Sequence, residues 1–584
     1  MMMNPTTQQL AAIKQRGNFV LTAIPGSGKT FVVGKRIHDL HSTEKLLPHQ
    51  GVASLSFTNN ASKEIEDTYF ATSGKRIRGP DFVGTIDSFL NHFIVSPYGH
   101  LVMGDQYKTP TILTSNEFIY KVYPGMKKYA KTYAPLDVTY RLDGSTTHSL
   151  SGKEQLMKQM MHQSNLLSLG DISYYAMKIL ETTNLATCLV NRFPYLMIDE
   201  AQDCSDVQMK IIDILANAGH KNIMLIGDPY QSIYVWRNAN PELFIGKSNS
   251  WDSLSLDISQ RSGDAICKLL NMFHQENDRI APCDDVQDCQ VIVISTENLE
   301  EVNSAVKYFS NKCNEMNIEI AVESTGILCG SNNLVNRFSG IKENNMYSQW
   351  KTDHSSCYSL PIRAKSKLYK TDYLGAVHLL TSYFYYQLND ELPKTNEDLE
   401  SSGLLSIDKK VLIWHCIHSI PNFDMTLDAW ISTTNDVLAN TSKLLGFELK
   451  YPLKKKQYRN GSEPTGDMTS WLVERSESTY LLSSEMNVET IHQSKGKSYN
   501  AVLVPFVSRS QKVSINKLST ALSSKDLFRN DSCEDERCIY VAFSRPKRLL
   551  VISVPKDQDL NLFNEFTKIQ SSELQTLLTS ISND

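Results

Sequence analysis

The segment "FVLTAIPGSGKTFVVGK", residues 19–35, combines glycines, a lysine and a threonine at spacings that suit a phosphate group. Gly26 and Gly28 allow backbone N–H groups to turn toward phosphate oxygens, and Lys29 can reach the β- and γ-phosphates. The Thr30 hydroxyl suits Mg²⁺, and the helix that starts here adds the positive end of its dipole. A glycine-rich turn before an ordinary helix is the alternative. The predicted contacts with a nucleoside triphosphate are Ala23, Pro25, Gly26, Ser27, Gly28, Lys29 and Thr30.

Two adjacent acidic residues end the apolar run within "YLMIDEAQD", residues 195–203. Carboxylates this close repel each other unless a cation or solvent compensates their charge. Asp199 is placed to hold Mg²⁺ through water, and Glu200 to orient and deprotonate an attacking water molecule. Thr30 and Asp199 are therefore the predicted metal contacts, and Lys29 joins both acids among the predicted catalytic residues. A solvated acidic turn is the alternative for this segment alone.

Apolar runs that stop abruptly at polar residues or glycine must position these groups. Such runs lie within residues 18–23, 51–60, 195–203 and 222–234, and helical patterns separate them. Continuous apolar strands that alternate with helices indicate a parallel sheet covered on both faces. The ligand site of such a sheet lies at the carboxyl ends of its strands, so we expect the four polar ends to line one crevice.

Similar strands later in the chain, within 326–331, 488–506 and 537–554, indicate a second α/β domain. Two mainly helical stretches interrupt the strand pattern and read as insertions, one in each domain. The predicted organisation is a first domain of residues 1–105 and 186–258, its insertion of 106–185, a second domain of 259–374 and 481–584, and its insertion of 375–480.

The composition limits the class of protein. The chain has 584 residues, of which 41% are hydrophobic and 21% charged, with a net charge of −5. This balance suits several buried cores, and it leaves any binding of DNA to local positive patches. The 11 cysteines show no CxxC spacing, which favours free thiols in a reducing compartment. No apolar run approaches the roughly 20 residues of a membrane span, so we expect a cytoplasmic protein.

Several motifs come in a fixed order: "AIPGSGKT", "DEAQD", "GDPYQSIYVWR", "TIHQSKGKSYNAV" and "YVAFSRP". Together they resemble the motifs of the UvrD/Rep-like superfamily 1A DNA helicases, and "NPTTQQLAAI" resembles the glutamine motif of that family. The resemblance covers about residues 1–260, 320–340 and 485–555. It implies an α/β fold of two RecA-like parallel-sheet motor domains with ATP between them, each interrupted by a mainly helical insertion.

The resemblance also assigns roles to residues of this chain. It implies that Gln9, or less favourably Gln8, contacts the adenine. Gln202 and Gln231 would sense the γ-phosphate, and arginines would reach that phosphate from the second domain, so hydrolysis requires the domains to close. The arginines in question are Arg261 and Arg545, and the remaining implied nucleotide contacts are Gln260 and Gly496.

Two departures from the family concern the base and the sugar. Gln260 stands where the family usually has an aromatic residue that stacks on adenine. Lys497 and Ser498 stand where the family has a glutamate that contacts the ribose. The phosphate-binding residues are intact, so we expect hydrolysis with weakened discrimination among nucleotides.

A track for single-stranded DNA needs aromatic side chains for stacking, next to groups that bind phosphate. The predicted DNA contacts are Phe57, Thr58, Asn59, Thr85, Tyr234, Trp236, Arg237 and His492. Phe57 could instead belong to the core, and Tyr234 could support its loop. The lysine-rich stretches 120–133 and 451–461 are further candidates, with a solvated basic face as the alternative.

These features predict an ATP- and Mg²⁺-dependent DNA helicase or NTPase that translocates on single-stranded DNA, with 3′-to-5′ direction implied by the resemblance. A second hypothesis starts from "DFVGTIDSFLNHFIVSPYG", residues 81–99, which resembles the helicase-like subunit of Gabija anti-phage systems. That resemblance implies a partner nuclease of the OLD family in a hetero-oligomer, and a role in sensing nucleotides or DNA ends without unwinding. A small-molecule kinase is disfavoured by Trp236 and Arg545. No membrane partner is expected.

Overall fold

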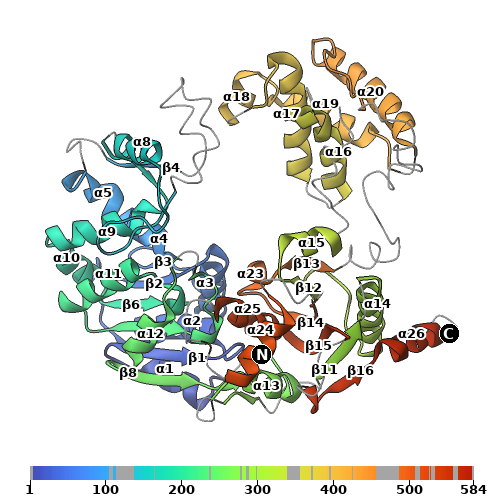
Figure 1. Ribbon diagram of the computed structural model, residues 1–584. Helices are drawn as coiled ribbons and strands as arrows, with labels where there is room; N and C mark the ends of the chain where they lie inside the picture. The colour runs from blue at the N-terminus through green and yellow to red at the C-terminus, as the bar shows by residue number, and fades with distance from the viewer. Residues whose placement is uncertain are drawn as a thin grey trace. The chain divides into compact units, whose positions relative to one another are not determined.

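The computed structural model describes residues 4–103, 109–113, 137–163, 165–235, 238–275, 279–283, 289–296, 299–338, 355–369, 373–393, 396–423, 425–455, 486–506, 513–524, 527, 533–556 and 563–581. The chain divides into two compact units (Figure 1). One unit consists of Met1–Asn332 together with Glu485–Asp584, and the other of Asn333–Ser484.

A six-stranded, all-parallel sheet forms the first part of the larger unit, with the order β3-β2-β6-β7-β1-β8. Its strands are β1 (Phe19–Ala23), β2 (Val52–Ser56), β3 (Phe82–Thr85), β6 (Tyr195–Ile198), β7 (Ile223–Gly227) and β8 (Asp252–Leu256). Its helices are α1 (Thr7–Lys14), α2 (Lys29–Thr43), α3 (Asn59–Ser73), α4 (Ile86–Leu90), α9 (Asp171–Thr182), α10 (Leu185–Arg192), α11 (Asp206–Asn217) and α12 (Pro241–Ser248).

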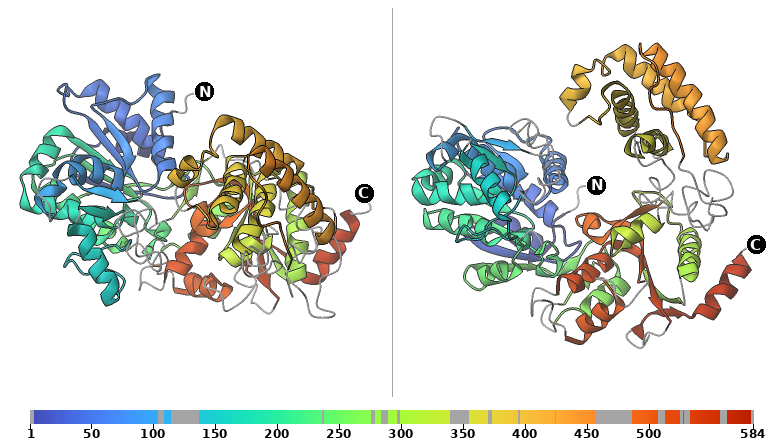
Figure 2. Two further views of the ribbon diagram at one scale, coloured as in Figure 1. Left: turned by 90° about the horizontal axis from the view of Figure 1, so that it is seen from above. Right: turned by 45° about the horizontal axis from the view of Figure 1, so that its top comes forward.

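The four inner strands β1, β2, β6 and β7 of this sheet are buried on both faces, as their continuous apolar runs require. Successive side chains of a strand point to opposite faces. Phe19 and Leu21 of β1 pack with Val33 of α2 and Ile65 of α3, whereas Val20 packs with residues of α9 and α11. The further views show the strands running between these two sets of helices (Figure 2). Two apolar cores therefore hold the sheet rigid and fix the positions of its strand ends.

A second six-stranded parallel sheet has the order β13-β12-β14-β15-β11-β16. Its strands are β11 (Gln290–Thr296), β12 (Thr325–Cys329), β13 (Asn487–Thr490), β14 (Tyr499–Pro505), β15 (Pro546–Pro555) and β16 (Thr567–Ile569). The neighbouring helices are α13 (Asp264–Asn271), α14 (Leu299–Glu315), α23 (Ile491–Ser494), α24 (Ile515–Ser524), α25 (Glu534–Phe543) and α26 (Ser571–Ile581). A short parallel pair, β9 (Ile258–Ser259) and β10 (Ala281–Pro282), follows β8 in the chain.

The two sheets share one topology. When the strands of each sheet are ranked by their order in the chain, both sheets read third, second, fourth, fifth, first, sixth. The fold class expected from the sequence, α/β with two parallel sheets, is confirmed. Because all strands of a sheet are parallel, the polar residues that follow β1, β2, β6 and β7 meet at one edge of the first sheet.

A polar network anchors the helical part of the larger unit, where β4 (Thr111–Leu113) pairs with β5 (Leu166–Ser168) next to α8 (Gly152–Gln163). Asp171 is fully buried and accepts hydrogen bonds from Lys158 Nζ at 2.8 Å and Ser168 Oγ at 2.9 Å. Its other oxygen lies 3.3 Å from His162 Nε2. Burial alone would raise the pKa of Asp171, but the bond to His162 and the charge of Lys158 hold it below its ordinary value.

The smaller unit is helical in its described residues. Its helices are α15 (Asn332–Phe338, which begins one residue before the unit), α16 (Ser355–Tyr369), α17 (Tyr373–Asn389), α18 (Asn396–Ser401), α19 (Ile407–Ser419) and α20 (Leu427–Leu444). Trp430 of α20 is buried in its core, where the indole N–H donates to the carbonyl of Pro421 at 3.1 Å. This unit extends beyond the range 375–480; the four-part division expected from the sequence stays a prediction.

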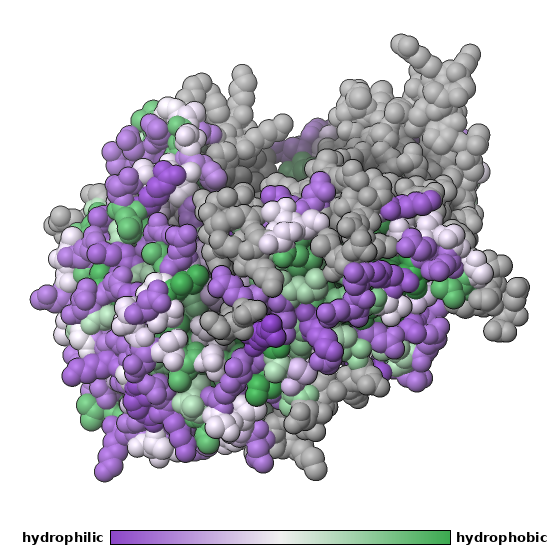
Figure 3. Space-filling model, turned by 60° about the horizontal axis from the view of Figure 1, so that its bottom comes forward, coloured by the Kyte–Doolittle hydropathy of each residue, from purple (hydrophilic) through white to green (hydrophobic). Residues whose placement is uncertain are grey.

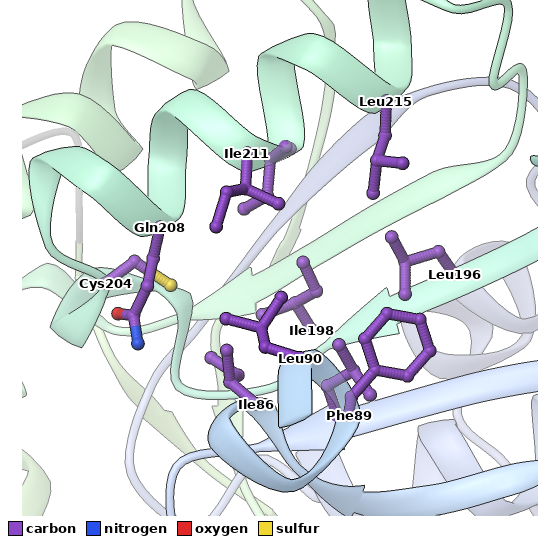
Figure 4. Close-up of a pocket in the computed structure, with 11 residues that line it drawn as sticks. Ile86, Phe89, Leu90, Leu196, Ile198, Cys204, Gln208, Ile211 and Leu215 are labelled. Atoms are coloured by element: carbon purple, nitrogen blue, oxygen red, sulfur yellow. The ribbon is translucent and has the colours of Figure 1, made fainter. Parts of the chain in front are cut away.

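An apolar hollow lies between the first sheet and helices α4 and α11 (Figure 4). Leu55 and Ile198 line it from the sheet, and Leu90 and Ile211 line it from the helices. It belongs to the core beneath the acidic turn and offers mostly aliphatic groups, so we treat it as packing and not as a ligand site.

The surface of the described residues carries mixed side chains. On the face that Figure 3 shows, hydrophilic and hydrophobic residues alternate in the coloured part without one broad hydrophobic area. Within the part of the chain that the structure describes, no helix is long and apolar enough to cross a membrane.

Candidate nucleotide and nucleic-acid site

The phosphate-binding loop joins β1 to the first turn of α2. Gly26 and Gly28 have φ values of +76° and +86°, a backbone conformation that favours glycine, and Gly28 caps α2. Lys29 and Thr30 are the first two residues of that helix. The Lys29 ammonium lies 3.4 Å from the carbonyl oxygen of Ala23, folded back over the loop. The loop thus has the backbone geometry in which N–H groups converge on an anion.

The N-terminal helix α1 supports this loop through Gln9. The buried Gln9 side chain accepts a hydrogen bond from the backbone of Thr6 at 3.0 Å and donates to the carbonyl of Ser27 at 2.9 Å. Gln8 instead bonds Asp257 at 2.5 Å. In this structure Gln9 therefore holds the phosphate loop, and its predicted contact with adenine stays a prediction.

The segment after β8 packs tightly against the loop. A Cβ added to Gly26 would lie 2.4 Å from Cβ of Arg261 and 2.9 Å from Oγ of Ser259. Ser259 donates to the carbonyl of Pro25 at 3.3 Å, and the backbone N–H of Gln260 donates to the carbonyl of Gly26 at 2.8 Å. The side-chain nitrogen of Gln260 is buried and has no hydrogen-bond partner among the residues that the structure describes. Gln260 is thus fixed beside the nucleotide loop with an unused donor.

The two acids of the turn after β6 are held in different electrostatic states. Burial and the charge of Glu200 raise the pKa of Asp199 to about 7. Burial would also raise the pKa of Glu200, but Lys29, Lys495 and a hydrogen bond from Gln202 lower it to about 2. Glu200 lies 4.0 Å from Lys29 Nζ and 2.6 Å from Gln202 Nε2. Glu200 is thus ionised at neutral pH, as a proton acceptor must be.

Asp199 and Thr30 are the residues that could hold a divalent cation. Asp199 is 3% exposed, so its charge is poorly compensated and a cation would stabilise its ionised form. Thr30 supplies a hydroxyl at the start of α2. Mg²⁺ is commonly held by one or two carboxylates together with water and substrate phosphates, and these residues fit that pattern. Within the described ranges, no cluster of three or more His, Cys, Asp or Glu side chains forms a metal site.

Two arginines, Arg261 in the segment before the second sheet and Arg545 directly before β15, lie next to groups of the first domain. The Arg545 guanidinium donates to Gln231 Oε1 at 2.6 Å across the cleft, and to Ser544 Oγ at 2.7 Å in its own domain. Arg261 Nη1 donates to the carbonyl of Ser544 at 3.4 Å. Burial and the charge of Arg545 lower the pKa of Arg261 to about 9, and burial lowers that of Arg545. Arg545 is buried and Arg261 is partly buried, and two cations that repel each other form a site suited to an anion.

Lys495 is a site residue that our sequence interpretation missed. It follows β13 and α23 in the second domain, and its side chain is 5% exposed. Its ammonium forms an ion pair with the buried Asp203, donates to the carbonyl of Gln231 at 2.6 Å, and lies 4.7 Å from the centre of the Tyr234 ring. The sequence signal was present, because this lysine stands between His492 and Gly496, both of which the sequence selected.

Three of the predicted contacts with single-stranded DNA lie close together and come from both domains. The rings of Phe57 and Tyr234 stack with centres 5.4 Å apart and planes 15° apart, and the centre of the His492 ring lies 6.4 Å from that of Tyr234. Glu534 of α25 accepts from the backbone N–H of Val235 at 3.2 Å and lies 4.0 Å from His492. Phe57 packs against the core at its edge and is only partly buried. The aromatic group is thus built across the domain boundary.

Threonine side chains form the N-caps of the helices that follow two neighbouring strands. Thr58 caps α3, with Asn59 as its first residue, and Thr85 caps α4 while its hydroxyl bonds Ser88 Oγ at 2.7 Å. β2 and β3 are paired, so both caps lie at one edge of the sheet. Thr490 caps α23 in the same way in the second domain.

Other sequence predictions lie outside the described residues or have ordinary surroundings. Trp236 and Arg237 lie outside, as do residues 114–136 and 456–485, which contain most of the two lysine-rich stretches. Within the described part of the second stretch, Lys455 pairs with an aspartate of α20 at 2.8 Å. Gly496 has a φ of +83°, which explains a glycine between two lysines that both form ion pairs.

A six-stranded parallel sheet whose first strand runs into a glycine-rich loop before α2 defines a P-loop protein, and the second sheet repeats its strand order. Residues 3–135 and 127–252 match the model of the UvrD/REP helicase N-terminal domain, and residues 467–557 match that of the UvrD-like helicase C-terminal domain. Together these matches cover more than half of the sequence, and the chain belongs to the UvrD/REP helicase family. The resemblance drawn from the motifs is confirmed.

Curated relatives match over part of their length. The chain is 29% identical over 269 residues to Gabija protein GajB of Bacillus cereus (strain VD045), which covers 45% of this chain and 48% of that protein. It is 24% identical over 297 residues to a probable DNA helicase II homolog of Mycoplasma capricolum subsp. capricolum, covering 46% and 41%. It is 22% identical over 286 residues to the ATP-dependent DNA helicase PcrA of Leuconostoc citreum, covering 45% and 38%. The matches thus span about half of these relatives or less.

Proposed function

We propose that this protein is a DNA-dependent NTPase that translocates on single-stranded DNA. The observation that carries the proposal is the hydrogen bond of 2.6 Å between Arg545 of the second domain and Gln231 of the first. It brings an arginine to the side of the cleft where the γ-phosphate of a nucleotide on the loop would lie. A site assembled from two domains works only when they close, which links hydrolysis to domain movement.

The residues divide the chemistry in a way that their contacts support. The backbone between Gly26 and Gly28 would hold the phosphates, and Lys29 would neutralise the β- and γ-phosphate charge. Ionised Glu200, oriented by Gln202, would position a water molecule and accept its proton. The arginines would stabilise the charge of the transferring phosphoryl group.

Mg²⁺ is proposed as the cofactor, held by Thr30 and Asp199 together with water and nucleotide oxygens. When bound, it would draw charge from the β- and γ-phosphate oxygens. ATP is the nucleotide implied by the family. Gln260 in place of a stacking aromatic leads us to propose that other nucleoside triphosphates are also hydrolysed.

The single strand would lie along the group formed by Phe57, Tyr234 and His492, with Thr58, Asn59 and Thr85 at the adjacent edge of the sheet. Bases stack on such aromatic faces without strong sequence preference. Trp236 and Arg237 follow directly in the chain and stay proposed contacts. The proposed direction is 3′ to 5′, by family resemblance, and the proposed location is the cytoplasm.

A second candidate is a sensor subunit that hydrolyses nucleotide on DNA ends without unwinding. The observation that favours it is the similarity to Gabija protein GajB, whose matched part covers 48% of that protein. In this version the chain would belong to an anti-phage complex with a nuclease of the OLD family. The motor chemistry is the same in both versions, and only the output differs.

One experiment separates the two. NTP hydrolysis is measured with and without a single-stranded oligonucleotide, and strand displacement is measured on a duplex with a 3′ single-stranded extension. Stimulated hydrolysis with displacement supports a helicase, and stimulated hydrolysis without displacement supports a sensor. Hydrolysis that does not respond to DNA refutes the proposal. Glu200→Gln, which removes the proton acceptor and keeps the shape, is the matched control for contaminating NTPases.

A further inference from the structure

Lys495 is a buried cation of the second domain whose ammonium meets three groups of the first. These are the carboxylate of Asp203, the carbonyl of Gln231 at 2.6 Å and the ring of Tyr234 at 4.7 Å. An ammonium has three N–H groups in tetrahedral directions, so it can serve a carboxylate, a carbonyl and a ring face at once. The planar guanidinium of an arginine could not reproduce this arrangement.

One of these contacts leads to the hydrolytic residues. Asp203 Oδ2, which pairs with Lys495, also lies 3.4 Å from Gln202 Nε2. Gln202 Nε2 in turn donates to Glu200 Oε2 at 2.6 Å. The carbonyl of Gln231 belongs to the residue whose side chain bonds Arg545. Lys495 therefore stands one side chain from the residue that orients Glu200.

The contact with the Tyr234 ring leads to the proposed binding track for single-stranded DNA, formed by Phe57, Tyr234 and His492. Tyr234, whose ring faces Lys495, stacks on Phe57 with a centre distance of 5.4 Å. A base that enters this stack must move the Tyr234 ring or compete for its faces. Either change alters the surroundings of the Lys495 ammonium, whose side chain is only 5% exposed, so that solvent has little access to replace a lost partner.

We propose that Lys495 is the positioning residue that couples occupancy of the strand track to the orientation of Glu200. In this way it sets the factor by which single-stranded DNA stimulates hydrolysis. The inference rests on the proposed function, since it assigns a residue to the DNA dependence of that activity. The path runs from Tyr234 through Lys495 and Asp203 to Gln202.

The test compares the ratio of DNA-stimulated to basal NTP hydrolysis in matched variants, with oligodeoxythymidine as the strand. Lys495→Met removes the charge and keeps a similar length, and Lys495→Arg keeps the charge without the geometry. We expect the stimulation ratio of both variants to be at least tenfold lower than that of the wild type. The KM for nucleotide, and the affinity for the oligonucleotide measured by fluorescence anisotropy, should change less than about fivefold. Lys312→Met is the control, because the Lys312 side chain of α14 pairs with Glu315 on its own helix at 2.8 Å.

A second variant approaches the path from its other end. Asp203→Asn should lower the stimulation ratio as Lys495→Met does, and the double variant should be no worse than the more affected single variant, because both act on one path. This arm also covers the case in which Lys495→Met fails to fold. If the wild type is stimulated and both single variants keep its ratio, the inference is overturned and the proposed function stands. If oligodeoxythymidine does not stimulate the wild type, both fail.

Discussion

Replacement of Arg545 is the most direct test of the contact between the two domains at the proposed nucleotide site. Its guanidinium donates to Gln231 across the cleft at 2.6 Å, and within its own domain to Ser544, to the carbonyl of Lys497 at 3.2 Å and to that of Val541 at 3.0 Å. Three partners in its own domain thus fix the Arg545 side chain, and a fourth partner, Gln231, belongs to the other domain. A lysine keeps the charge but cannot hold its anchors and reach Gln231 together.

The magnitude follows from the bond that crosses the cleft. A hydrogen bond to a charged group contributes about 1.5–3 kcal/mol. If it is expressed fully in the transition state, its loss lowers kcat by about 10–150-fold, at about 1.36 kcal/mol for each factor of ten. We therefore expect Arg545→Lys to lose about that much. Arg545→Ala also removes the charge near the γ-phosphate and should lose about 10³-fold or more.

The assay is steady-state NTP hydrolysis with saturating single-stranded oligonucleotide, together with a titration of fluorescent nucleotide. Because the cross-domain contact acts on the closed state, kcat should fall while nucleotide affinity changes little. Arg548→Lys is the matched control, since Arg548 lies on the following strand β15 and bonds the carbonyl of Met316. A decrease of less than threefold in kcat for Arg545→Ala, in a variant with wild-type circular dichroism, would refute the assignment.

Three further outcomes are expected. Gly26→Ala forces a Cβ into a contact of 2.4 Å at a φ of +76° and should abolish nucleotide binding in a fluorescence titration, whereas Gly246→Ala, which has open space around it, should bind normally. Asp171→Asn removes the carboxylate charge that faces the buried Lys158 ammonium and should cost about 3–5 kcal/mol of unfolding free energy in urea at pH 7. Because the folded pKa of Asp171 is below 3.8, its stabilisation is present above that pH and is lost as the pH falls through the lowered pKa, so a constant difference down to pH 2 would contradict the assignment. Gln260→Phe supplies a stacking ring and should raise the preference for ATP over GTP and CTP in kcat/KM; equal selectivity in both proteins would contradict a role in base discrimination.

The sequence predicted the parts of the site that depend on local order. Gly26, Gly28 and Lys29 form a loop whose conformation is set within a few residues, so the pattern alone located it. Asp199 and Glu200 follow a buried strand, and parallel strands bring such ends together whatever the rest of the chain does.

The parts that the sequence left open depend on contacts between distant segments. Lys495 and Asp203 are separated by 292 residues, and no spacing pattern relates them. The amide of Gln9 bonds the phosphate loop, a contact that depends on how α1 packs on α2 and that the motif alone does not specify. The stack of Phe57 on Tyr234 likewise arises from two strand ends that meet only in the folded sheet.

Because the two sheets share one strand order, this single chain contains two copies of the same sheet topology with different sequences. In the first copy the leading strand runs into "IPGSGKT", whereas in the second copy the leading strand β11 is followed by "ENLEE", which contains no glycine. The first domain carries the glycine-rich loop, and the second domain places Arg545 against Gln231 and Lys495 against Asp203. If the proposed function holds, we expect one nucleotide to bind for each pair of sheets. If the proposed function holds, the sequence after β11 binds no phosphate, so substitutions there should affect nucleotide binding less than substitutions in the loop after β1.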